Sequence, residues 1–219
     1  MLLSAKPKTV LAGLVPAIHV WRRICLAVVL LTIASCTTDR SILINRTCPP
    51  VGEGYYWPAE GLPGFYTRAL MRMNEPSLFC GDRLEESYRF LWLHVYARPV
   101  AVRVSRTKDG AELEAIELSG SGGYDPGVVT QRIKRQLLAA EWQTLEQMLG
   151  RADFWRLPTR EERIGADGAV WVTEGRRGNT YHVVDRWWPD NPNYIALGRF
   201  FMDLSGMTFP GDGFPKVRQ

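Results

Sequence analysis

Few side chains in this sequence have the types and spacing that acid–base, nucleophilic or metal chemistry requires. Of the three histidines, His94 and His182 lie beyond the first 35 residues. His182 with Asp185 or Glu174 could form an acid–base or metal site. However, Asp185 lies three residues along a predicted strand and therefore points to the opposite face. We interpret both histidines as packed residues, and we expect no catalytic residues, no metal site and no cofactor.

The loop Ser119-Gly-Ser121-Gly-Gly-Tyr-Asp125 invites a nucleophile interpretation. A nucleophile elbow requires Gly-x-Ser-x-Gly, and Ser119 occupies the place of the first glycine. The lysine of a phosphate-binding loop is also missing. The segment therefore predicts a flexible or tightly turned loop, with Asp125-Pro126-Gly127 as an ordinary turn. A hydrolase built around His182 is the least favoured functional hypothesis.

Cys36 stands at the end of an apolar run that follows Arg22 and Arg23. A secretory leader combines positive charge, an apolar stretch of about 7–15 residues and small residues before the cut. The run from Ile24 to Ser35 has 12 residues, whereas a helix that spans a membrane needs about 20. The last four residues, Ile33-Ala34-Ser35-Cys36, resemble the lipobox of bacterial lipoproteins.

This resemblance implies that a diacylglycerol is attached to the Cys36 thiol and that the chain is cut before Cys36. Thr37 follows, in place of the Asp linked to inner-membrane retention, which implies the periplasmic face of the outer membrane. The membrane is then a partner through the lipid on Cys36. The alternative is an inner-membrane protein with a single uncleaved N-terminal anchor, which would bury Arg22 and Arg23 near the middle of the membrane at a cost.

Removal of residues 1–35 changes the charge of the chain. The whole sequence has 27 basic and 23 acidic residues, a net charge of +4. The predicted leader holds four of the basic residues and no acid, so the mature chain keeps 23 of each and is neutral. It lacks the basic footprint of a nucleic-acid-binding protein, and we expect no nucleic acid among its partners.

The cysteines support export. Cys25 lies in the predicted leader and Cys36 would carry the lipid, so Cys48 and Cys80 remain as an even pair in an oxidising compartment. A redox or metal pair is less favoured, because the chain has no Cys-x-x-Cys and no histidine near these two residues. The sequence therefore predicts a disulfide between Cys48 and Cys80.

Hydrophobic periodicity predicts the elements of the mature chain. Period-two patterns predict strands at 88–96, 100–104, 112–118, 128–137, 169–174 and 180–187. Period-3.6 patterns predict helices at 139–149 and 194–204. Lys108-Asp109-Gly110 predicts a tight turn, and Gly175–Asn179 a turn between the last two strands. The order predicts an α+β fold: a single two-layer domain with an antiparallel sheet and two helices packed on one face.

The chain then divides into a lipoprotein signal peptide (1–35), a tether (36–47), a Pro- and Gly-rich segment stapled by the disulfide (48–87) and an α+β domain (88–219). Thr67–Met73 in the stapled segment is a possible short helix. The pattern over 88–205, with Phe-Trp-x-Leu-Pro from Phe154 and Trp-x-Pro from Trp187, also resembles domains of uncharacterised exported bacterial proteins. This resemblance implies an architecture and no activity.

Aromatic residues suggest binding. Trp187 and Trp188 are neighbours on a predicted strand and face opposite sides, so one of them is a candidate surface contact. The leading hypothesis is a non-catalytic, lipid-anchored periplasmic module that binds an unknown envelope protein or glycan, or stabilises an envelope assembly. The second is a cell-wall or carbohydrate-binding domain that uses Trp187 or Trp188 together with Tyr181 and Arg186.

Overall fold

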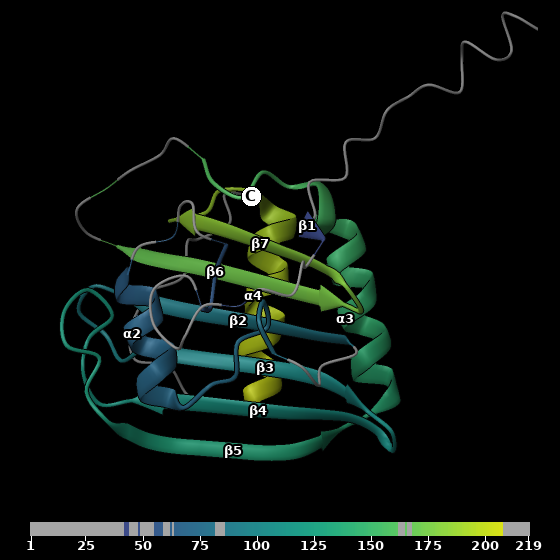
Figure 1. Ribbon diagram of the computed structural model, residues 1–219, viewed down its shortest axis with the longest axis horizontal. Helices are drawn as coiled ribbons and strands as arrows, with labels where there is room; N and C mark the ends of the chain where they lie inside the picture. Colours follow the sequence, from purple (N-terminus) through teal and green to yellow (C-terminus); the bar gives the residue numbers. More distant parts are fainter. Residues whose placement is uncertain are drawn as a thin grey trace, which may run out of the picture. The chain divides into compact units, whose positions relative to one another are not determined.

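The computed structural model contains a seven-stranded sheet in the order β1-β7-β6-β2-β3-β4-β5, with every neighbouring pair antiparallel (Figure 1). The structure describes residues 42–43, 48, 55–58, 62, 64–81, 86–161, 165 and 168–207. They belong to one compact unit, Asp39–Gln219. The predicted leader, Cys36 and the residues after Met207 lie outside the described residues.

The helices and strands follow the order expected from the sequence. Their bounds are β1 Ile42–Leu43, α2 Gly64–Met73, β2 Glu86–His94, β3 Val100–Thr107, β4 Gly110–Leu118, β5 Val129–Leu137, α3 Ala139–Arg151, the 3-10 helix η1 Phe154–Arg156, β6 Ala169–Arg177, β7 Thr180–Trp187 and α4 Pro192–Ser205. Every strand and both long helices predicted above are present. Part of the predicted tether is ordered as well, because Ile42 pairs with Tyr181 at the edge of the sheet.

The predicted turn over Gly175–Asn179 is shorter in the structure. Strand β6 continues to Arg177, and the chain reverses at Gly178, whose φ is 57°. Gly175 stays in the strand because the Phe154 ring lies against it, and a Cβ at this position would come within 2.6 Å of that ring. This glycine therefore provides room for close packing and does not mark a reversal.

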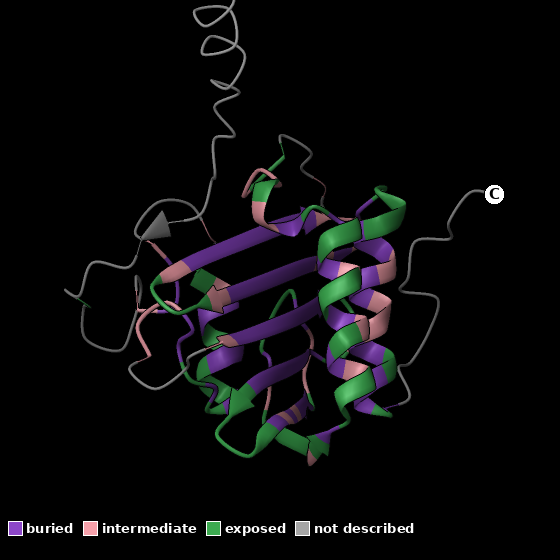
Figure 2. Ribbon diagram, turned by 90° about the vertical axis from the view of Figure 1, so that its right-hand side faces the viewer, coloured by how far each residue is buried: buried purple, intermediate pink, exposed green. Residues whose placement is uncertain are grey.

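Helices α3 and α4 cover one face of the sheet, which confirms the predicted α+β arrangement with two helices on one face. Figure 2 shows these helices with exposed outer sides and central strands that are buried along their length. Phe90, Trp92 and Trp171 lie fully buried between the sheet and the helices. Gly198 of α4 allows the close approach, because a Cβ there would lie 2.3 Å from the Trp171 ring.

A third layer covers the opposite face of the sheet, where α2 lies in front of the strands in Figure 1. Leu91 and Leu93 of β2 point to this side and pack under Leu70 and Met73 of α2. The two-layer prediction describes the sheet with α3 and α4 correctly and omits this layer. Because β2 carries large apolar residues on both sides, both faces of the sheet need a cover.

Glu141 stabilises the start of α3, and its loss is expected to have a small, measurable effect. Its carboxylate accepts the Leu138 backbone N–H at 2.8 Å and binds both Nη atoms of Arg135 at 2.8 Å. The Arg135 hydrogen bonds are the largest cause that lowers the Glu141 pKa.

Replacement of Glu141 by glutamine is therefore expected to lower the free energy of unfolding by about 0.5–1 kcal/mol at neutral pH, as measured by urea unfolding. A carboxyl group whose pKa is lower in the folded protein stabilises the fold at pH values above its unfolded-state pKa. This stabilisation is lost as the pH falls through its folded-state pKa. The difference between wild type and variant should shrink below pH 4. An unchanged difference there would contradict this role of the ionised carboxylate.

Candidate functional site

The four residues suggested for ligand contact do not share an exposed surface in the structure. Tyr181 is fully buried in the cluster beneath α2, where its hydroxyl donates to Glu174 at 2.9 Å. Arg186 is five positions further along β7 and points to the opposite face, near the ring of Tyr194. The alternation of side chains along the strand separates Tyr181 from Arg186.

Arg186 and the two tryptophans after it stabilise the end of β7. Arg186 is 4% exposed and pairs with Glu161 at 2.8 Å. Trp187 is half-buried against Gly165. Trp188 has a φ of 46°, so the strand pattern ends before it, and its half-buried ring packs on the cluster under α3 and α4. The expectation of opposite strand faces therefore does not apply to this pair.

His182 lies in packed surroundings and faces away from the acidic residues considered with it, whereas His94 is partly buried at the end of β2. His182 is 1% exposed, and its ring meets the Phe154 ring edge-on at 5.1 Å. Asp185 lies on the other face of β7, where it accepts from Tyr66 at 3.2 Å and pairs with Arg160 at 3.2 Å. Burial raises the pKa of Asp185, and Arg160 opposes that rise. The predicted separation of His182 from Asp185 is confirmed.

The serine loop between β4 and β5 is tightly turned. The Ser119 hydroxyl accepts the Val128 N–H at 3.1 Å. The Gly122 N–H is 2.9 Å from the His94 carbonyl oxygen and 3.1 Å from that of Ala97. A Cβ on Gly122 would lie 2.8 Å from the His94 oxygen, so the glycine allows this contact. The loop is thereby fixed against the end of β2.

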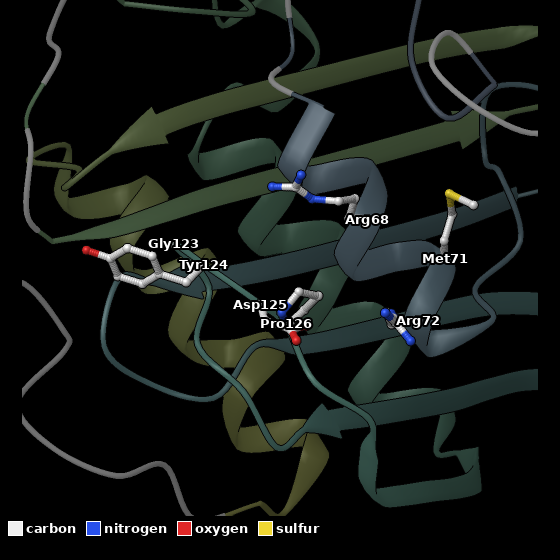
Figure 3. Close-up of a pocket in the computed structure, with 7 residues that line it drawn as sticks. All are labelled: Arg68, Met71, Arg72, Gly123, Tyr124, Asp125 and Pro126. Atoms are coloured by element: carbon white, nitrogen blue, oxygen red, sulfur yellow. The ribbon is translucent and has the colours of Figure 1, made fainter.

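An open cavity of about 890 Å³ lies between α2 and this loop, and it is the candidate functional site (Figure 3). One wall belongs to the outer side of α2 and the other to the loop. The lining residues are Arg68, Met71, Arg72, Gly123, Tyr124, Asp125 and Pro126. They combine two cations, one carboxylate, a phenol ring and the apolar side chains of Met71 and Pro126.

Helix α2 positions the two cations of the cavity. Its inner side buries Tyr66, Leu70 and Met73, so Arg68 and Arg72 remain on the solvent side one turn apart. Figure 3 shows Arg68 extending from the helix toward the loop that carries Tyr124. The amphipathic pattern of α2 therefore fixes the direction of both guanidinium groups.

The loop contributes an aromatic surface and a carboxylate to the cavity. Tyr124 is 63% exposed, and its ring centroid lies 6.5 Å from that of Tyr96, which is 67% exposed. Asp125 accepts the Gly127 N–H at 3.0 Å through Oδ1, which orients its side chain. Tyr96 was predicted to lie in a strand, but β2 ends at His94 and Tyr96 lies in the following turn.

A chain of buried ion pairs, here called the ionic chain, ties the end of α2 to the sheet. Glu75 lies two residues after α2 and accepts from Arg89 at 3.2 Å and from Arg103 at 2.9 Å. Arg89 and Arg103 are register neighbours on β2 and β3. Each has a second carboxylate, Glu174 for Arg89 and Glu114 for Arg103. The Glu75 carboxylate therefore separates two adjacent like charges inside the protein.

Neither the cavity nor the ionic chain was predicted from the sequence. A signal for the ionic chain was present, because a charged residue in a strand that is apolar on both faces needs a buried partner. Arg89 between Tyr88 and Phe90 is such a residue. No comparable signal marks the cavity, because its walls come from segments separated by about 50 positions in the chain.

Comparison with known proteins adds no relative: no family model matches the chain, and no curated protein matches it. Among the described residues, no cluster of three or more His, Cys, Asp and Glu side chains is suited to bind a metal ion. In the same part of the chain, no helix combines the length and the hydropathy needed to cross a membrane.

Proposed function

We propose that this protein is a lipid-anchored module of the bacterial periplasm that binds a component of the cell envelope and does not act on it chemically. The observation that carries the binding role is the cavity of about 890 Å³, which is lined by two exposed arginines of α2 and an exposed tyrosine of the β4–β5 loop. Ligand sites commonly have volumes of about 300–1,000 Å³ and a small number of placed polar groups.

The distribution of titratable groups supports binding without catalysis. The cavity presents guanidinium groups and one carboxylate, and its lining contains no histidine, serine or cysteine among the described residues. His182 and Glu174, the buried groups best suited to proton transfer, lie in the packed interior beside Phe154 and Arg89. Arginine stays protonated at physiological pH and suits recognition of anions better than general acid–base work.

The location rests on the lipobox resemblance and is supported by the disulfide between Cys48 and Cys80, whose Cα atoms are 5.7 Å apart. Disulfides persist in oxidising compartments such as the periplasm. The outer membrane is the proposed address because Thr37 follows the lipidated cysteine.

Replacement of Cys36 by serine is expected to abolish incorporation of radiolabelled palmitate in growing cells, because the thiol is the proposed acyl acceptor. The matched control is Cys25→Ser, which alters the leader outside the lipobox and should keep the label. Fractionation should place wild type with the outer membrane. An unlabelled wild-type protein would contradict the anchor.

The binding role is tested separately with a photo-crosslinking amino acid at position 124 of the full-length protein in intact cells. A control crosslinker at Gln143, an exposed position of α3 on the other face of the sheet, measures random encounters. We expect a defined envelope adduct from position 124 alone. Equal adducts from both positions, or none from either, would contradict binding at the cavity.

A further inference from the structure

We infer that the cavity recognises an anionic glycan, that is, a chain of sugar rings that carries carboxylate or phosphate groups. This inference rests on the proposed function and names the ligand class of the same site. It follows from the cations, the aromatic pair and the geometry of the loop, each of which limits the chemistry of the ligand.

The two arginines of α2 are available to an anion. Arg68 and Arg72 are exposed, and neither forms an ion pair or a hydrogen bond with another residue in the described part of the chain. Arginines elsewhere, such as Arg103 and Arg135, are bound to carboxylates of the protein itself. A guanidinium group binds carboxylate and phosphate through two parallel hydrogen bonds. Two groups one helical turn, about 6 Å, apart suit anionic substituents repeated along a polymer.

The aromatic pair favours a sugar ring beside those anions. Tyr124 and Tyr96 present exposed rings inclined by 34° to each other. A tyrosine ring offers an apolar face for the C–H side of a pyranose and a hydroxyl for its polar edge. The loop hydrogen bonds through Ser119 and Gly122 hold Tyr124 in place before binding, which lowers the entropy cost of association.

Asp125 favours one orientation of the ligand in the cavity. Its carboxylate stands on the loop wall, opposite the arginines of α2. It would repel an anionic group placed near Tyr124, whereas it can accept a hydrogen bond from a sugar hydroxyl. The ligand should therefore turn its anions toward Arg68 and Arg72 and its uncharged ring toward the loop.

The test is co-sedimentation of the full-length protein, purified in detergent, with isolated peptidoglycan sacculi, whose anions are carboxylates. A second arm uses vesicles that contain lipopolysaccharide, whose anions include phosphates, and vesicles of the same lipids without it measure insertion of the acyl chains proposed on Cys36. An insoluble uncharged glucan is the neutral control. We expect binding to at least one anionic glycan, with no binding to the glucan and weaker binding at 0.5 M salt.

The double variant Arg68→Gln/Arg72→Gln is expected to weaken this binding about tenfold or more, because charge-assisted hydrogen bonds are lost. The matched control Lys108→Gln/Arg151→Gln removes the same charge from exposed positions outside the cavity and should bind as wild type does. Tyr124→Ala should also weaken binding, and Tyr124→Phe, which keeps the ring, should largely retain it.

Three results would overturn the inference: equal binding to the uncharged glucan, wild-type affinity in the double arginine variant, or no binding to either anionic glycan. A defined protein adduct from position 124 without glycan binding would overturn the ligand class and leave the proposed function standing. The absence of both adduct and glycan binding would overturn the two together. Unchanged melting temperatures of the variants exclude unfolding as the cause of lost binding.

Discussion

Replacement of Arg89 by methionine is expected to lower the free energy of unfolding by about 3–5 kcal/mol, because removal of one partner leaves buried charges without compensation. The side chains of Arg89 and Glu174 are 0% exposed and that of Glu75 is 1% exposed. The Arg89 guanidinium also donates to the Pro76 carbonyl at 2.7 Å. The substitution therefore leaves two carboxylates and one carbonyl group short of a donor.

Urea unfolding of the variant measures this loss. Arg106→Met is the matched control, because Arg106 also lies on the sheet and pairs with Glu86, but its side chain is 48% exposed. The control should cost at most about 1 kcal/mol. Equal losses in the two variants would contradict the buried role of Arg89.

The loss should also depend on pH. Burial raises the pKa of Glu174 above its ordinary value of 4.5, and Arg89 opposes this rise. Without Arg89 the pKa should rise further. When the pKa of a carboxyl group is higher in the folded protein than in the unfolded chain, its stabilising contribution is complete at pH values below the unfolded-state pKa. The contribution is lost as the pH rises through the folded-state pKa. The deficit of Arg89→Met should therefore be larger at pH 8 than at pH 5.

The fold was largely predictable from the sequence because its strands and helices are bounded by local signals. Period-two runs and the Lys108–Gly110 turn gave the meander from β2 to β5, and the stripe of Trp142, Leu145 and Leu149 gave α3. The layer above the other face was harder to predict. Its packing depends on contacts between Pro- and Gly-rich segments and the sheet, and such contacts produce no hydrophobic periodicity in the sequence.

The candidate site was not predictable in the same way. Trp187 and Tyr181 were predicted as ligand contacts because they are aromatic. The exposure of Trp187 depends on where β7 ends, and that of Tyr181 depends on the cover that α2 provides. Arg68 and Tyr124 line one cavity only because the β4–β5 loop is fixed beside α2. Residue type alone does not distinguish a buried tyrosine from an exposed one, since both are common for this amphipathic side chain.

The position of α2 depends on two sets of interactions that follow its C-terminus. The ionic chain holds Glu75 against β2 and β3, while Cys80 joins the same segment to Cys48. The Ser77 hydroxyl adds a local bond, because it donates to the Tyr55 carbonyl at 2.7 Å. The cavity wall formed by α2 is therefore a consequence of interactions that lie beneath and after the helix.

Removal of the disulfide through Cys48→Ala/Cys80→Ala is expected to lower the free energy of unfolding by about 3–4 kcal/mol, because the bond closes a separation of 32 residues and restricts the unfolded chain. The fold itself should persist, since Ser77 accepts the Cys80 N–H at 2.7 Å and Arg176 donates to the Leu78 carbonyl at 3.3 Å without the bond. Urea unfolding with and without reductant measures the effect.

Wild type in reductant should match the double alanine variant, and the variant should not respond to reductant. Thiol labelling of the unfolded, unreduced protein provides the independent control, because joined Cys48 and Cys80 should not react. Two reactive thiols would mean that the cysteines are separate. In that case the ionic chain and the hydrogen bonds of Ser77 and Arg176 would have to hold the segment after α2, and Arg89→Met should weaken its attachment further.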